Sequence, residues 1–100
     1  MRHPYYILDG QTPVHEPDVR AWGRWFEKAD RQVAEDRCGP VRISTVFLGL
    51  DHNCATRGPP ALFETMIFGG PHDGLMWRAS TWDEALLIHY EACARVGTPA

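Results

Sequence analysis

The sequence predicts an α+β protein in which two helices pack on one face of a four-stranded, mainly antiparallel sheet. Two long stretches have the spacing of apolar residues that is typical of amphipathic helices. Four shorter stretches are rich in β-branched, aromatic and aliphatic residues, which favours strands. Turn signals join the last three strands into a meander. The expected order of elements is therefore β-α-β-β-β-α.

Length and composition predict one domain that spans residues 1–100 and has a single hydrophobic core. Hydrophobic residues make up 44% and charged residues 23%, as in ordinary globular chains. No apolar run reaches the roughly 20 residues that a membrane-spanning helix needs. The N-terminus lacks the pattern of a signal peptide, so we expect a cytoplasmic protein without a membrane partner.

The first elements are predicted to be a strand at Tyr5–Leu8 and a long helix from Pro17 to about Asp36. Asp9-Gly10 is a turn signal that ends the strand, and a loop follows it. A proline followed by an acid is typical of a helix start. Within the helix, apolar residues recur at spacings of three and four. They are Val19, Trp22, Phe26, Ala29 and Val33.

Three further strands are predicted at Val41–Leu50, Ala61–Gly70 and Leu75–Ser80. Side chains alternate between the two faces of a strand, and both faces of the first two of these strands carry apolar residues. Two helices cover only one face of such a sheet. The other face is then exposed and apolar, which a small monomer rarely shows. We therefore expect a homodimer through the sheet face, or another protein packed there.

The C-terminal helix places a histidine where the pattern requires an apolar residue. Thr81 and Glu84 fit a capping box, which fixes the start of the helix and hence its phase. His89 then lies in the middle of the stripe that faces the sheet. The other residues of that stripe are Trp82, Ala85, Leu86, Cys93 and Val96.

A buried imidazole needs hydrogen-bond partners, and the sequence offers two kinds. In the structural interpretation, His89 bonds to a backbone carbonyl or to a strand hydroxyl such as that of Thr45 or Thr65. In the functional interpretation, it meets Glu64 or Asp51 in a cleft, as an acid–base or ligand-binding pair. The loop after the second predicted strand adds polar groups at a strand end. The candidate ligand-binding residues are His89, Glu64, Asp51, His52, Asn53, Thr45 and Thr65.

Other chemistry has little support in the sequence. The three cysteines form no CxxC pair, and they are expected to be reduced thiols. A metal site of His52, His72 and Glu64 can be drawn, but no spacing requires it. We therefore predict no metal, no cofactor and no catalytic residue. No nucleophile motif is present, and a net charge of −3 does not favour direct nucleic-acid binding.

Several stretches taken together resemble a family of small uncharacterised bacteriophage and prophage proteins. The stretches are "YYILDG", the Trp-rich first helix, "STVFLGLDHN", "LFETMIFGG" and "STWDEA", so that the resemblance runs from Tyr5 to about Val96. The chain departs from the family pattern at "HEPD" and at "NCATRGPP". The resemblance implies an accessory protein that binds a host protein, including a defence complex, or its nucleotide signal.

The sequence thus predicts a binding protein that acts by association and not by catalysis. One alternative is a small enzyme or ligand sponge whose pocket gathers His89, Glu64, Asp51 and His52. Another alternative is a structural component of a phage particle. These three functions belong to different classes.

Overall fold

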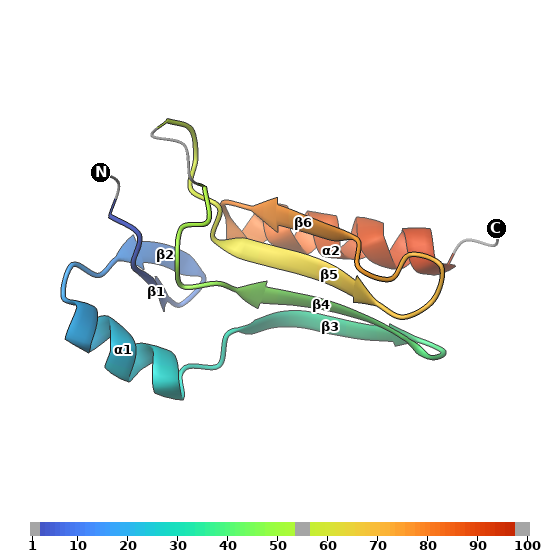
Figure 1. Cartoon of the computed structure of the whole chain (residues 1–100), viewed down its shortest axis with the longest axis horizontal. Coiled ribbons are helices and arrows are strands. Elements are labelled where there is room, and N and C mark those ends of the chain that lie inside the picture. Colours follow the sequence, from blue (N-terminus) through green and yellow to red (C-terminus); the bar gives the residue numbers. More distant parts are fainter. Residues whose placement is uncertain (1–2, 54–56, 98–100) are drawn as a thin grey trace.

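The computed structural model describes residues 3–53 and 57–97 of the chain. It confirms the α+β class and the four-stranded antiparallel sheet. The order of elements is β-β-α-β-β-β-β-α, because a two-stranded hairpin precedes the first helix. Figure 1 shows helix α2 (Trp82–Gly97) along the sheet, and helix α1 (Val19–Lys28) beside the hairpin beyond one end of the sheet. The prediction that both helices cover one face is wrong, since α2 alone covers it.

The N-terminal hairpin corrects the prediction for the first strand. Strand β1 (Tyr6–Asp9) pairs with β2 (Thr12–His15), a segment that was expected to be a loop. The turn signal Asp9-Gly10 is correct, but it joins these two strands to each other. The hairpin is attached to the rest of the chain by an isolated bridge between Tyr5 and Leu50. The predicted first strand therefore belongs to a separate sheet.

The predicted helix from Pro17 to Asp36 is also corrected, because its second half is a strand. Asp18 caps α1 by accepting from the amide of Arg20, and the helix ends at Lys28. Strand β3 (Gln32–Cys38) then pairs with β4 (Val41–Phe47) over a two-residue loop. The first loop residue, Gly39, has φ of 59°, a conformation that glycine adopts at little cost. This strand pairing prevails over the helical spacing that continues as far as Val33.

The main sheet has the strand order β3-β4-β5-β6, with β5 at Phe63–Phe68 and β6 at Met76–Ala79. Every neighbouring pair is antiparallel, as the meander predicts. Alternate side chains of the strands point toward α2. These positions include Ile43, Phe47, Phe63 and Ile67, which are buried to 1% exposure or less.

Two apolar clusters lie between the sheet and α2. The first contains Phe47, Leu62, Phe63, Ala79 and Ala85, and the half-buried side chains of Tyr6, Leu8 and Trp25 close its end. The second contains Val41, Ile43, Ile67 and Ala92. Between them lie three buried polar residues from three elements, namely Thr45 of β4, Thr65 of β5 and His89 of α2. The core is therefore interrupted by a group of buried polar residues.

Candidate functional site

The start of α2 fixes where His89 points. The Thr81 hydroxyl accepts from the amide of Glu84 at 3.1 Å, as the capping box predicts. The carboxylate of Glu84 reaches back to the amide of Ser80 at 3.1 Å, one residue before the expected donor. Counting from this cap, Ala85, His89 and Ala92 face the sheet, and all three are buried. The predicted phase of the helix is confirmed.

His89 is bonded through both ring nitrogens, although none of its surface is exposed. Nδ1 lies 2.7 Å from the hydroxyl of Thr45, which lies 2.6 Å from the hydroxyl of Thr65. On the other side of the ring, Nε2 lies 2.8 Å from a carboxylate oxygen of Asp36. The predicted bond to a strand hydroxyl is thus confirmed, and the acidic partner is Asp36.

Asp36 connects the three buried polar residues to the surface. It is on β3, an edge strand, and its side chain is 54% exposed while that of His89 is fully covered. The same carboxylate oxygen accepts from the thiol of Cys93 at 3.8 Å. His89 and Cys93 are four residues apart, so they project from one face of α2 one turn apart. We call the five residues Asp36, Thr45, Thr65, His89 and Cys93 the polar layer.

The directions of these hydrogen bonds follow from what each group can donate. The Asp36 carboxylate only accepts, so the Nε2–H of His89 donates to it. If the ring is neutral, Nδ1 accepts from Thr45, and Thr45 accepts from Thr65. If Nδ1 also carries a proton, it donates to Thr45, whose own proton then turns toward Thr65. The two hydroxyls can therefore satisfy His89 in either state.

Glu64 and the loop residues predicted to join His89 lie elsewhere. Glu64 alternates with Thr65 along β5 and therefore points away from α2, where it pairs with Arg78 at 3.4 Å. Asp51 lies in the loop after β4 and accepts from the amides of Asn53 and Ala61, at 2.8 and 3.0 Å. The predicted partnership of His89 with Glu64 is wrong, because the sheet separates them.

The loop after β4 has a structural role of its own. The backbone amide of His52 donates to the carbonyl of Ala61, and the side-chain amide of Asn53 donates to that of Pro59. These bonds hold the strand-end loop against the segment that leads into β5. Residues 54–56, which include Cys54, lie outside the described part of the chain. Of the seven predicted site residues, His89, Thr45 and Thr65 come together.

Nucleophilic catalysis does not fit the geometry of the polar layer. A hydroxyl, an imidazole and a carboxylate are aligned, as they are in a catalytic triad. However, Thr45 and His89 have no exposed surface, and Thr65 is 2% exposed. A substrate carbonyl cannot reach a hydroxyl that is enclosed between sheet and helix. The arrangement therefore holds α2 to the sheet. Among these residues, only the carboxylate of Asp36 and the thiol of Cys93 reach the solvent.

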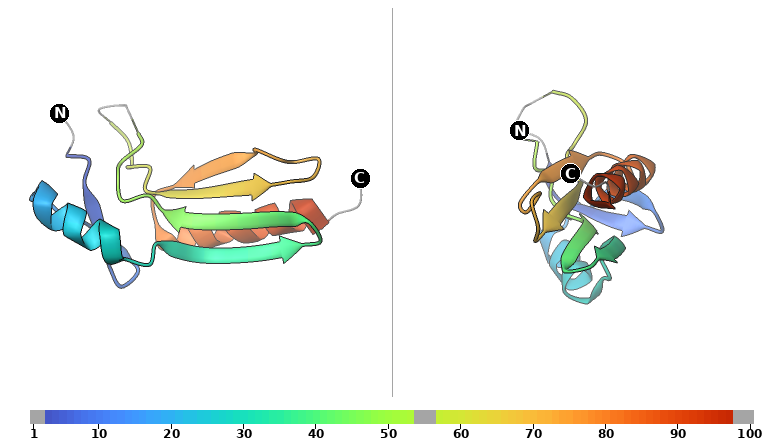
Figure 2. Two further views of the ribbon diagram at one scale, coloured as in Figure 1. Left: turned by 60° about the horizontal axis from the view of Figure 1, so that its bottom comes forward. Right: turned by 90° about the vertical axis from the view of Figure 1, so that its right-hand side faces the viewer.

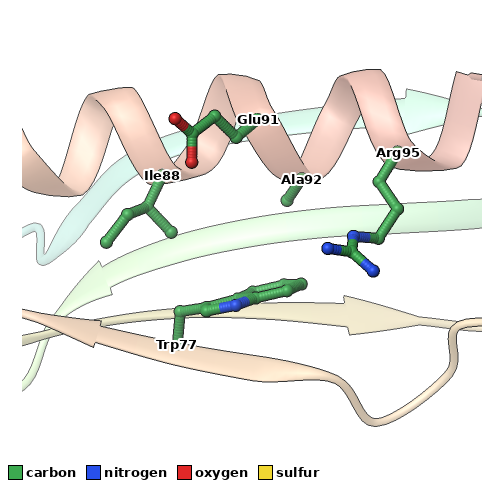
Figure 3. A pocket seen from close by; sticks show the side chains of 5 residues that line it. All are labelled: Trp77, Ile88, Glu91, Ala92 and Arg95. Carbon is green, nitrogen blue, oxygen red and sulfur yellow. The ribbon is translucent and has the colours of Figure 1, made fainter.

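A small cavity lies on the other side of α2, between the helix and β6. Its volume is about 60 Å³, and Trp77, Ile88, Glu91, Ala92 and Arg95 line it. Figure 3 shows the ring of Trp77 below the helix and the side chain of Arg95, which extends from the helix toward that ring. The guanidinium carbon of Arg95 lies 5.6 Å from the centroid of the Trp77 ring. Sites for small molecules are usually about 300–1,000 Å³. This cavity is therefore large enough for a few water molecules but not for a nucleotide.

The thiol of Cys93 is held in its protonated form by its surroundings. Partial burial raises its pKa above the ordinary 9.0, and the charge of Asp36, the hydrogen bond to Asp36 and the charge of Cys38 raise it further. Each cause disfavours the thiolate, which is the reactive species. The contribution of Cys38 places this second thiol near the same end of the polar layer.

We expect Cys93 to react slowly with iodoacetamide at pH 8 and Asp36→Asn to accelerate the reaction. The variant removes the carboxylate charge, so that the pKa of Cys93 falls toward 9.0 and more thiolate is present at a given pH. Mass spectrometry of the modified peptide against time and pH measures the rate. Glu35→Gln is the matched control, because Glu35 is the preceding residue of β3 and faces away from α2. A similar acceleration in both variants would contradict this explanation.

Comparison with protein-family models, with curated proteins and with solved structures finds no significant match to this chain. The resemblance to phage proteins therefore stays a prediction. In the part of the chain that the structure describes, no helix is long and apolar enough to cross a membrane.

Proposed function

We propose that the protein acts by association, and that two copies pair through the sheet face opposite α2. The observation that carries this proposal is the position of α2, which covers one face of the sheet while no described element covers the other. Figure 1 looks onto that second face, and Figure 2 shows α2 on the far side of the strands. We call it the open face. Its apolar residues are Val46, Met66, Phe68 and Met76, with Met76 40% and Phe68 37% exposed.

The register of the strands places these apolar side chains side by side. Met66 is opposite Ser44 on one neighbouring strand and opposite Met76 on the other, which forms a row across the middle of the face. Phe68 is opposite Arg42, whose guanidinium lies 4.2 Å from the ring centroid. Met66 is half-buried and Phe68 and Met76 are exposed, so a partner can still exclude water from these side chains.

The charges of the open face fit a second copy of the same chain. Arg42 pairs with Glu35 at 3.6 Å and Arg78 pairs with Glu64 at 3.4 Å, so both signs are interspersed. A face with charges of one sign would repel its own copy, whereas this face does not. Its apolar content is nevertheless smaller than the sequence implies, because charged pairs occupy much of it. The proposal is therefore a modest interface.

The size of the face sets the expected strength of the dimer. Four strands about 4.8 Å apart, with about 3.3 Å per residue, make a face of roughly 20 × 20 Å. Stable interfaces bury about 800 Å² on each partner, and smaller ones belong to weak or transient complexes. We therefore expect a weak dimer, with a dissociation constant that is about micromolar or larger.

A further partner can bind the outside of α2 in such a dimer. Leu87 and Tyr90 are 61% and 60% exposed there, three residues apart on the helix surface. The resemblance to phage proteins supports a host protein as this partner, including a component of a defence complex. The nucleotide signal of such a complex is the alternative ligand that the resemblance implies.

Sedimentation analysis across protein concentrations tests the self-association. We expect the mass to rise from 11.3 kDa toward twice that value, and Met66→Glu to weaken the dimer by at least about tenfold. The new carboxylate would be desolvated at the centre of the interface. Leu87→Glu is the matched control, because it adds the same charge to the outside of α2 and leaves the dimer unchanged. A mass that stays at 11.3 kDa up to about 1 mM would contradict the proposal.

A further inference from the structure

We propose that Asp36, His89 and Cys93 form a binding site for a divalent transition-metal ion of the zinc class. The site is separate from the open face, since Asp36 and its partners lie on the side of the sheet that α2 covers. One carboxylate oxygen, one imidazole nitrogen and one sulfur all lie within 4.8 Å of one another. Carboxylate, imidazole and thiolate are the three kinds of side chain that hold zinc in proteins.

The backbone arrangement explains why these three groups converge. His89 and Cys93 are one turn apart on α2, the same spacing that lets two ligands on one helix share an ion. Asp36 is supplied by β3, which runs along the helix at the edge of the sheet. A rigid helix and a paired strand thus position all three groups, and ligands on such elements are placed more accurately than ligands on loops.

Two of the three distances between the ligand atoms are within about half an ångström of tetrahedral values, and the third, between Nε2 of His89 and the sulfur of Cys93, is at most 4.8 Å. Around a tetrahedral zinc ion, ligand atoms at about 2.0–2.3 Å from the metal are roughly 3.3–3.8 Å from each other. The sulfur of Cys93 is 3.8 Å from the carboxylate oxygen of Asp36, which is close to this value. Nε2 of His89 is 2.8 Å from that oxygen and must separate from it by about half an ångström. Asp36 can make this change because its side chain is 54% exposed.

The buried hydroxyls supply the support that a metal-binding imidazole needs. An imidazole that binds a metal through one nitrogen usually donates from the other to a nearby oxygen, which fixes the ring. Thr45 is 2.7 Å from Nδ1 of His89, opposite the side on which the ion would sit. On binding, the ring proton moves from Nε2 to Nδ1 and is donated to Thr45, whose proton then points to Thr65. Thr45, Thr65 and His89 therefore stay in contact in this exchange, with the directions of their hydrogen bonds reversed.

The charges also match a divalent ion. Binding replaces the thiol proton of Cys93, which leaves to solvent, so the ligands are a carboxylate, a thiolate and a neutral imidazole. Their total charge of −2 balances the +2 of the ion. A sulfur ligand selects zinc-class ions over magnesium or calcium, which take oxygen ligands. Three protein ligands at a partly exposed position leave the fourth coordination position open to solvent.

Titration of the whole chain with Co²⁺, followed by displacement with Zn²⁺, tests the site. We expect one ion per chain and a thiolate-to-cobalt charge-transfer band in the near ultraviolet. The band should persist in Cys38→Ser/Cys54→Ser, where Cys93 is the remaining thiol, and it should disappear in Cys93→Ser. Asp36→Asn should weaken binding by at least about tenfold, and so should Thr45→Val, which removes only the hydroxyl that supports His89.

Two outcomes would overturn the proposed metal site. The first is a missing charge-transfer band in the variant that keeps Cys93 alone. The second is equal Co²⁺ affinity in Asp36→Asn and in the control Glu35→Gln, whose side chain points to the open face. Circular dichroism of each variant tests whether it is folded. Asp36→Asn is the variant expected to disturb the fold least, because the side chain of Asp36 is exposed. A dimer that fails to form would leave this result unaffected, because no residue of the open face is a ligand.

Discussion

Phe47→Ala is expected to lower the free energy of unfolding by about 3–5 kcal/mol, the usual cost of truncating a buried phenylalanine. Phe47 has no exposed surface and lies in the larger apolar cluster. Its ring centroid is 5.3 Å from that of Phe63 and 5.9 Å from that of Trp25. It therefore packs against both the sheet core and the first helix, so that its loss leaves a cavity where these parts meet.

Denaturant unfolding followed by tryptophan fluorescence measures this loss, because Trp25 reports on the same contact. A domain of this size is stable by about 5–15 kcal/mol in total, so Phe47→Ala is near the limit of folding. Phe47→Leu gives a milder comparison, with an expected loss of about 1–2 kcal/mol. Phe68→Ala removes the same side chain from the open face, and it should cost less than about 1 kcal/mol. Equal losses for Phe47→Ala and Phe68→Ala would mean that the assignment of faces is wrong.

Local patterns predicted the sheet and the last helix because each carries its own signal. The strands β4, β5 and β6 are rich in β-branched and apolar residues, and the capping residues Thr81 and Glu84 define where α2 begins. These features depend only on residues close together in the chain. The prediction of the antiparallel meander followed from the turn signals in the loop at 51–60 and in the tight turn at 71–74, and the structure confirms it.

The same reasoning failed between Ala29 and Asp36, where the apolar spacing of a helix continues into a strand. Val33 is in phase with the helix, but it packs against the main core from β3. Gly39-Pro40 was interpreted as the break that ends the helix, but segments of seven residues on each side of it pair as a hairpin. The sequence does not state whether such a turn ends a helix or joins two strands, because the answer depends on the partner strand.

The candidate site was predicted in part for the same reason. The helical phase placed His89 toward the strand hydroxyls, and it is bonded to Thr45. Asp36 was missed because it was assigned to a helix, and because its contact with His89 joins residues 53 positions apart. Register between distant elements decides such a contact. The spacing of His89 and Cys93, four residues apart on one helix, is the sequence signal for the end of the polar layer that meets Asp36.

His89→Ala is expected to cost about 3–5 kcal/mol, because it removes a buried ring and leaves buried hydroxyls short of a partner. His89→Leu separates these two effects, since leucine refills most of the space but forms no hydrogen bond. We expect His89→Leu to cost about 1–3 kcal/mol, which is the penalty for the hydroxyl of Thr45 that then lacks its acceptor. Asp36 adds little to that penalty, because its exposed carboxylate returns to water.

The double variant His89→Leu/Thr45→Val decides whether the polar layer acts as one unit. If the cost of His89→Leu comes from the stranded Thr45 hydroxyl, then removing that hydroxyl recovers part of the stability. The two substitutions should then deviate from additivity by about 0.5–3 kcal/mol in denaturant unfolding. Additive losses would show that His89 stabilises the fold by packing alone. Leu87→Ala on the outside of α2 is the control, and it should combine additively with Thr45→Val because Leu87 is 61% exposed.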